Sequence, residues 1–193
     1  VSLTRIQDLT KALNSGADLL ELRTDYFTDT QLHYLVAHSK LPIIYTIKRP
    51  TKYLPKVAYT DIDYRSKLKP AGKVIRSFHD YKRTPASITL DRIIQSILKK
   101  KCIPKIATLV KSVNDLYILA KLQSKYKKKI IVVGMGELGL MTRLYNKSLL
   151  TYAAVSNTTK TAVGQLTVKQ MQSTRLYGLV GDDIQHSLSP KLH

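Results

Sequence analysis

A single lysine stands in the middle of a short apolar segment, CIPKIATLV, over residues 102–110. Because burying an unpaired ammonium group is expensive, a lysine inside a buried strand needs a physical reason. One reason is chemical: burial and neighbouring cations lower the pKa of a lysine, and its neutral amine can attack a ketone to form a Schiff base. The alternative is structural: Lys105 lies in an edge strand and extends its ammonium group into water. The segment by itself leaves both interpretations open.

Other reactive side chains stand at the ends of predicted strands. In parallel α/β folds, binding sites form at the carboxyl ends of the strands. The side chains expected there place opposite charges around one lysine and one histidine: Glu21, Arg23, Lys48, Arg49, Asp63, His79, Lys105 and, after a glycine-rich turn, Arg143. A histidine acid/base beside a Schiff-base lysine suits chemistry next to a ketone.

Strands and helices alternate along the chain, which is typical of parallel βαβ units. The sequence predicts seven strands within residues 16–26, 41–50, 61–64, 73–85, 102–110, 129–143 and 151–155. Helices are predicted over residues 1–15, 30–38 and 85–100, after Ser112, and after residue 168. The segment 51–60 is polar and shows no helical period.

Apolar and charged residues alternate along the first predicted strand. Leu20 and Leu22 share one face, and Glu21 and Arg23 share the other. The charged face is either a salt-bridged surface in solvent or, in a barrel, the inward face.

The glycine-rich turn matches GxGxxG through Gly134, Gly136 and Gly139. A lone match of this kind is often only a tight turn. A dinucleotide site also needs an acidic residue about 20 positions later, where Val155 and Ser156 stand instead. The sequence therefore argues against nucleotide binding at this turn.

The net charge of +19 raises the question of a nucleic-acid partner. However, the densest lysine clusters, 99–101 and 125–129, fall where predicted helices end, and cations are favoured there. Basic and aromatic residues do not interleave as they do in RNA-binding strands. An anionic small substrate is another use for a positive field. The lone cysteine excludes an internal disulfide, no apolar run is long enough for a membrane helix, and a cytoplasmic location is expected.

Five segments, in this order and spacing, resemble type I 3-dehydroquinate dehydratase, a (β/α)8 TIM-type barrel enzyme of the shikimate pathway: GADLLELRTDYF, SFHDYKRTP, PKIATLV, MGELGLMTR and TAVGQ. The resemblance implies an α/β barrel domain over residues 1–172 that dehydrates 3-dehydroquinate to 3-dehydroshikimate without a metal or other cofactor. The family's first strand would precede Val1, so the barrel is expected to lack that strand.

The resemblance also implies residue roles. Lys105 falls on the Schiff-base lysine, and His79 falls on the acid/base histidine. Substrate-binding roles are implied for Glu21, Arg23, Lys48, Arg143, Thr161 and Gln165. Two departures stand out: Lys48 replaces an arginine, and the family's Glu-Gly-Gly motif, whose carboxylate partners the histidine, is missing from residues 50–60. Asp63 is the candidate substitute for that carboxylate.

Residues 173–193 resemble the opening of the shikimate dehydrogenase substrate-binding domain, with Ser187 and Ser189 at the family's shikimate-binding serines. This implies that the chain is the dehydratase part of a bifunctional polypeptide. NADP is expected only for the dehydrogenase domain, which is absent from this chain.

Two other functions stay open at this stage. The barrel could be an inactive relic that serves as a structural module, or a basic module that binds nucleic acid. The leading hypothesis expects the anionic small molecule 3-dehydroquinate as partner, with no membrane and no nucleic acid, and it leaves a homodimer open.

Overall fold

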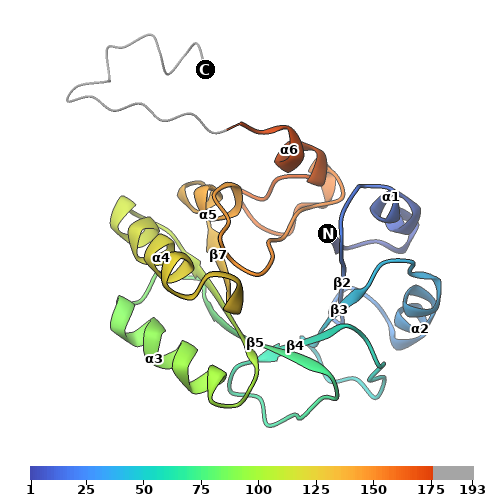
Figure 1. Ribbon diagram of the computed structural model, residues 1–193. Coiled ribbons are helices and arrows are strands. Elements are labelled where there is room, and N and C mark those ends of the chain that lie inside the picture. Colours follow the sequence, from blue (N-terminus) through green and yellow to red (C-terminus); the bar gives the residue numbers. More distant parts are fainter. Residues whose placement is uncertain (176–193) are drawn as a thin grey trace.

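A computed structural model of the chain describes residues 1–175 (Figure 1). Seven parallel strands form one curled sheet in the order in which they occur along the chain. They are β1 (Ser2–Leu3), β2 (Leu20–Arg23), β3 (Ile43–Thr46), β4 (Tyr59–Asp63), β5 (Lys73–Asp80), β6 (Ile103–Leu109) and β7 (Ile131–Met135). Strand neighbours that follow one another in sequence are the pattern of repeated β-crossover-β units, as the sequence predicts.

The segment 149–155 brings the two edges of this sheet together. The Leu149 amide donates to the Ile130 carbonyl at 2.9 Å, next to the start of β7. The Ser2 amide donates to the Ala153 carbonyl at 3.0 Å, and Ser2 forms a parallel bridge with Ala154. The segment therefore occupies the eighth position of a barrel, although its pairing with β1 is limited to that bridge.

The expected absence of the first strand is wrong. Ser2 pairs with Glu21 in parallel register, so the chain itself supplies β1. The expected helix over residues 1–15 is also wrong at its start, because the regular α-helix is α1 (Leu9–Leu13). A two-residue strand is too short to show alternation, and the apolar spacing of Leu3, Ile6 and Leu9 imitates a helical period.

The helices lie on the outside of the curled sheet (Figure 1). Besides α1 they are α2 (Asp29–His38), α3 (Ser87–Leu98), α4 (Val113–Tyr126), α5 (Met141–Leu144) and α6 (Val168–Ser173). The predicted capping box is present at α4, where the Ser112 hydroxyl accepts from the Asp115 amide. The lysine clusters 99–101 and 125–129 follow or close α3 and α4, as expected for cations at helix C-termini. No helix in residues 1–175 has the length and apolar character needed to cross a membrane.

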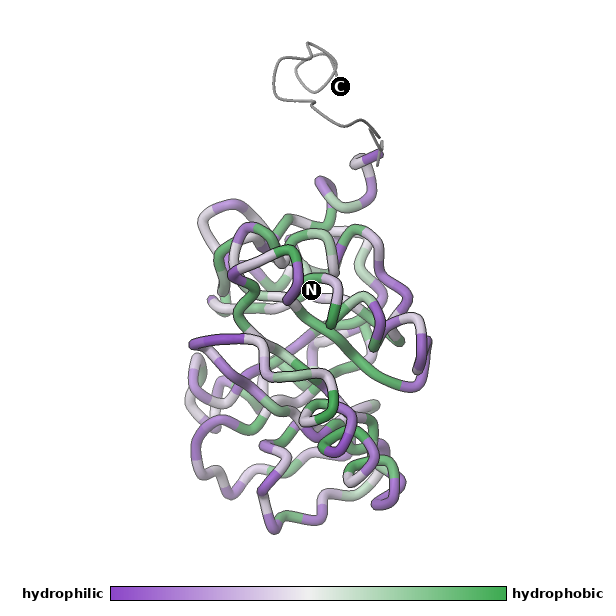
Figure 2. Tube along the Cα trace, turned by 90° about the vertical axis from the view of Figure 1, so that its left-hand side faces the viewer, coloured by the Kyte–Doolittle hydropathy of each residue, from purple (hydrophilic) through white to green (hydrophobic). Residues whose placement is uncertain are grey.

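Apolar side chains on the outer face of the sheet pack against these helices. Leu20 and Leu22 are fully buried in a cluster with α1 and α2. A second cluster joins α3 and α4 to β6 and β7. Figure 2 shows hydrophobic stretches of the trace in the middle of the molecule and hydrophilic stretches at many of its outer bends. Glu21 and Arg23 therefore face the barrel interior, as the barrel interpretation of the alternation requires.

Loops replace helices after β3 and β4, in agreement with the non-helical pattern of residues 51–60. Arg76 ties the second of these loops to β5. Its Nη1 atom donates to the carbonyls of Tyr64 and Ser66 at 3.2 and 2.7 Å, and Nη2 donates to the Leu68 carbonyl at 3.1 Å. The buried arginine thus satisfies backbone acceptors at a place where no helix covers the sheet.

We expect Arg76→Leu to lower the free energy of unfolding by about 2–3 kcal/mol, because three carbonyls lose a charged donor. Chemical denaturation measures the loss, and limited proteolysis should cut residues 64–72 faster. The matched control is Arg65→Leu on the exposed side of the same loop. Equal stability and protease resistance of the Arg76 variant and the wild type would show that the arginine does not hold this loop.

Candidate active site

Four polar side chains from alternate barrel positions are buried inside the curled sheet: Glu21 from β2, Asp61 from β4, Lys105 from β6 and Tyr152 from the segment 149–155. Alternate strands of a TIM-type barrel supply the side chains of one interior layer. Lys105 Nζ donates to Asp61 Oδ2 at 2.8 Å and lies 4.2 Å from the centre of the Tyr152 ring. Because β6 is an inner strand of the sheet and Lys105 is only 6% exposed, the edge-strand alternative is wrong.

Hydroxyl groups from β1, β3 and β5 hold the two carboxylates. Ser2 on β1 and Thr46 on β3 donate to the Glu21 carboxylate, the latter at 2.9 Å. Ser77 on β5 donates to the Asp61 carboxylate. Each buried carboxylate therefore has fixed hydrogen-bond donors, which a buried charge requires.

The positive charge on Lys105 is stabilised by its surroundings. Burial acts to lower the pKa of Lys105, but the negative charge of Asp61, with smaller contributions from Tyr152 and Glu21, outweighs burial and raises it. This is opposite to the lowered pKa expected from burial and neighbouring cations. The amine can act as a nucleophile only after it loses a proton, and Asp61 is its hydrogen-bonded acceptor.

His79 stands near the carboxyl end of β5 and lines the same cavity as Lys105. Burial, followed by the positive charges of Lys48 and Lys105, lowers the pKa of His79 to about 3. The imidazole is therefore neutral at pH 7 and can accept a proton. Its ring stacks on the Tyr81 ring, with the centres 5.8 Å apart.

The expected role of Asp63 beside His79 is wrong. Asp63 is exposed, and its carboxylate accepts from the Arg65 amide at 2.9 Å. Among residues 1–175, no carboxylate forms a hydrogen bond or ion pair with the His79 ring. Alternation places Asp61 and Asp63 on the same face of β4, and Asp61 is the one that is buried and bonded to Lys105.

Arg143 is a buried cation without a counter-ion in the described part of the chain. Its Nη1 atom donates to the Tyr152 carbonyl at 3.2 Å, and its Nε atom has no partner there. Burial lowers the pKa of Arg143 to about 10, so the guanidinium remains charged at neutral pH. A desolvated guanidinium with a free donor is a site for an anion, above all a carboxylate.

The glycine-rich turn positions this arginine. The Thr142 hydroxyl accepts from the Gly134 amide at 2.8 Å and donates to the Gly139 carbonyl at 2.7 Å. A Cβ atom on Gly139 would lie 2.4 Å from the Gly134 carbonyl carbon, so only glycine permits this approach. The glycines serve backbone packing, which supports the tight-turn interpretation of GMGELG.

The cavity holds about 100 Å³ and brings together most of the residues that the sequence singles out. Those that line it are Glu21, Arg23, His79, Lys105, Arg143, Thr161 and Gln165. Thr161 donates to Gln165 Oε1 through its amide and its hydroxyl, at 2.7 and 3.0 Å, which orders the loop over the cavity. Lys48 is exposed and does not line the cavity, but its positive charge contributes to the lowered pKa of His79. Ser187 and Ser189 lie outside the described residues.

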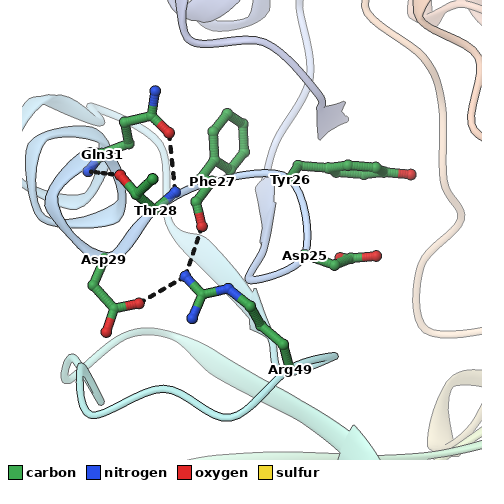
Figure 3. A pocket seen from close by; sticks show the side chains of 7 residues that line it. All are labelled: Asp25, Tyr26, Phe27, Thr28, Asp29, Gln31 and Arg49. Atoms are coloured by element: carbon green, nitrogen blue, oxygen red, sulfur yellow. Dashed lines mark hydrogen bonds and ion pairs between the residues drawn. The ribbon is translucent and has the colours of Figure 1, made fainter.

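Arg49 does not compensate for the lysine at position 48. Its guanidinium donates to Asp29 and to the Phe27 carbonyl, each at 2.8 Å, in an outer pocket at the start of α2 (Figure 3). The loop that follows is drawn to the same helix, because the Tyr53 ring stacks on His33 with the centres 3.6 Å apart. This packing explains why residues 50–58 contribute nothing to the cavity lining.

Besides Asp61, sequence reasoning missed three residues with polar side chains that line the cavity: Ser2, Tyr81 and Tyr152. Ser2 belongs to a strand too short to recognise. Tyr152 was part of a predicted strand, but an aromatic residue in a strand usually indicates core packing. Tyr81 follows His79 by two residues and therefore shares its face, which was a usable signal.

The fold and the cavity together define the class of protein. A curled parallel sheet with outer helices and a polar cavity at the carboxyl ends of its strands is an α/β fold of the TIM-barrel type. Within this class, the chain belongs to the type I 3-dehydroquinase family, whose sequence profile matches residues 56–179.

Individual relatives agree with this assignment. The chain is 30% identical to a 3-dehydroquinate dehydratase of Methanococcus maripaludis, over 86% of this chain and 90% of that protein. It is 27% identical to a bifunctional 3-dehydroquinate dehydratase/shikimate dehydrogenase of Arabidopsis thaliana, over 96% of this chain but 38% of that protein. The crystal structure of the Aquifex aeolicus 3-dehydroquinate dehydratase superimposes with a TM-score of 0.72 at 26% identity, covering 89% of this chain and 93% of that one.

A double-mutant cycle should detect the interaction between Lys105 and Asp61. We expect Lys105→Met to lower the free energy of unfolding by about 3–5 kcal/mol, because it leaves a buried carboxylate unpaired. Lys105→Met combined with Asp61→Asn should recover most of that loss, as measured by chemical denaturation. Additive losses in the double variant would contradict the pairing.

His79 should make stability depend on pH. Its pKa is about 3 in the folded chain and has its ordinary value of 6.5 when unfolded. Between these values only the unfolded state binds the proton, so stability falls as pH falls, with a slope of up to about 1.4 kcal/mol per pH unit. Denaturation at several pH values should give a smaller slope for His79→Gln. The exposed control His38→Gln should keep the wild-type slope, and an unchanged slope in the His79 variant would contradict a buried neutral imidazole.

Proposed function

We propose that this chain is a 3-dehydroquinate dehydratase, which converts 3-dehydroquinate to 3-dehydroshikimate through a Schiff base on Lys105. One observation carries the proposal: the buried Lys105–Asp61 pair shares a cavity region with a neutral histidine and with a guanidinium that lacks a counter-ion. A ketone, an acidic C–H bond and a carboxylate are the substrate groups that these three features match. Family membership and the names of the relatives support the same substrate.

Substrate binding begins with the carboxylate. Arg143 presents a free Nε donor at the cavity and can form a bidentate pair with a carboxylate. Glu21, Arg23 and Gln165 offer hydrogen-bond partners to the hydroxyl groups of the ring. Lys48 adds positive charge near the cavity, but its ammonium group lacks the planar geometry of the arginine found in the family.

Lys105 then provides the nucleophile. Its ammonium passes a proton to Asp61, the acceptor at 2.8 Å, and the free amine attacks the substrate ketone. Loss of water gives an iminium, which acidifies the adjacent C–H bond because it can accept the electron pair. The iminium is its own electron sink, so the proposed reaction needs no metal or organic cofactor.

His79 carries the proton through the elimination. The neutral imidazole removes the proton beside the iminium, and an enamine forms. The enamine then expels the β-hydroxyl group, which takes the proton from His79 and leaves as water. Hydrolysis of the iminium releases 3-dehydroshikimate and restores Lys105.

The parent protein is proposed to be bifunctional. The Arabidopsis relative joins the two activities in one polypeptide, and this chain spans 38% of its length. We infer that residues 1–172 form the dehydratase part and that residues 173–193 begin a shikimate dehydrogenase domain.

An inactive barrel that serves as a structural module is the second candidate. It is favoured by two observations: Lys48 replaces the family's arginine, and His79 has no carboxylate partner among residues 1–175. Against this candidate, His79 is a weak base but can still remove the proton beside an iminium, because the iminium makes that C–H bond far more acidic.

Borohydride trapping tests the proposal on the chain as it stands. Borohydride reduces an imine to a stable amine, so incubation with 3-dehydroquinate should give one adduct, which peptide mapping places on Lys105. Intact mass also reports elimination, since the dehydrated adduct is lighter by one water. We expect His79→Gln to shift the trapped species to the heavier, undehydrated adduct.

The paired variant Lys105→Met/Asp61→Asn is the control, because it removes the amine without leaving a buried charge. It should give no adduct in the barrel, while random modification of exposed lysines stays at the wild-type level. If the wild type unfolds cooperatively but forms no adduct on Lys105, the proposal is wrong and the inactive barrel is favoured.

A further inference from the structure

The hydroxyl group of Tyr152 has no hydrogen-bond partner in the described part of the chain, although the atom is buried. Buried polar atoms are bonded in the great majority of cases, so an exception needs an explanation. The Tyr152 side chain lines the cavity, and its ring face lies against Lys105 Nζ at 4.2 Å from the ring centre. The mechanism proposed above leaves this hydroxyl unused.

We propose that Tyr152 is a further catalytic residue, whose hydroxyl donates a hydrogen bond and then a proton to the oxygen on the carbon that Lys105 attacks. This inference rests on the proposed function and deepens it. It assigns the formation and hydrolysis of the Schiff base to Tyr152, and it leaves the C–H step to His79.

The position of the ring supports this assignment. Lys105 Nζ lies over the ring at 4.2 Å from its centre, so a ketone carbon bonded to Nζ can bring its oxygen within hydrogen-bond reach of the phenol hydroxyl. The missing partner of the hydroxyl would therefore arrive with the substrate oxygen. Burial raises the pKa of Tyr152, so the phenol keeps its proton and is a donor before the substrate binds.

The proposed step balances in atoms and charge. As the Lys105 amine bonds to the ketone carbon, the carbonyl oxygen takes the Tyr152 proton, and the phenolate recovers a proton from the new ammonium. The resulting carbinolamine then loses its hydroxyl as water: the nitrogen lone pair forms the C=N bond, the C–O bond breaks, and Tyr152 supplies the proton. Hydrolysis runs these steps in reverse and returns the proton to Tyr152.

The test measures how fast the adduct on Lys105 appears in a single turnover, by quenching wild type and Tyr152→Phe with borohydride at increasing times. We expect the variant to form the adduct at least tenfold more slowly, since general acid catalysis contributes factors of this size or larger. The share of dehydrated adduct at the end should be unchanged, because His79 performs the elimination.

Stability separates a catalytic role from a structural one. Removing a buried hydroxyl without a partner should leave the melting temperature equal or higher. The matched control is Tyr45→Phe, which removes a buried tyrosine's bond to the Tyr53 carbonyl at 2.9 Å. That variant should melt earlier and form the adduct at the wild-type rate.

Three outcomes would contradict the proposed catalytic role of Tyr152. A wild-type adduct that appears equally fast in Tyr152→Phe overturns this inference alone. A slower adduct accompanied by a lower melting temperature also overturns it, because the hydroxyl would then have a structural partner. No adduct on Lys105 in the folded wild type overturns the proposed function and this inference together.

Discussion

The ion pair between Lys105 and Asp61 is the interaction on which the rest of the site depends. Two opposite charges in the interior of a small barrel are tolerable only if both are paired and hydrogen-bonded. Asp61 meets this condition through Lys105 and Ser77, and Lys105 through Asp61 and the face of Tyr152. Hydroxyls and carboxylates from neighbouring strands therefore surround this lysine. An apolar cluster that includes Ile44, Ile75 and Ile131 fills another part of the same interior, and the remaining core lies on the outer face under the helices.

Two basic side chains of the same cavity, Arg143 and His79, have different protonation states at neutral pH. Arg143 stays charged because even its lowered pKa of about 10 is well above neutral pH. His79 stays neutral because burial and two neighbouring lysines oppose a further positive charge. The same electrostatic field thus prepares an anion site and a proton acceptor within one cavity, and the histidine keeps its neutral form without the carboxylate partner that the family resemblance implies.

Much of the fold and of the site could be predicted because it depends on local patterns. The alternation of Leu20 and Leu22 with Glu21 and Arg23 indicates two unlike faces, and the regular alternation of strands and helices indicates a parallel sheet. The short strand at Ser2–Leu3 was not predicted, because two residues are too few to show the alternation of a strand. The pairing of Asp61 with Lys105 was not predicted. Asp63 lies on the same face of β4, and alternation along one strand does not show how deep in the barrel a residue lies.

The sequence by itself determined the order of the elements, the faces of the strands and the residue types available at their carboxyl ends, because these follow from spacing along one chain. Only the tertiary structure decided that the segment 149–155 meets β1, that Asp61 pairs with Lys105, and that Arg49 turns toward Asp29. These contacts join residues 20 to 152 positions apart, and their distances depend on how the sheet curls. Burial and charge then set the pKa values of Lys105 and His79, which no spacing along the chain encodes.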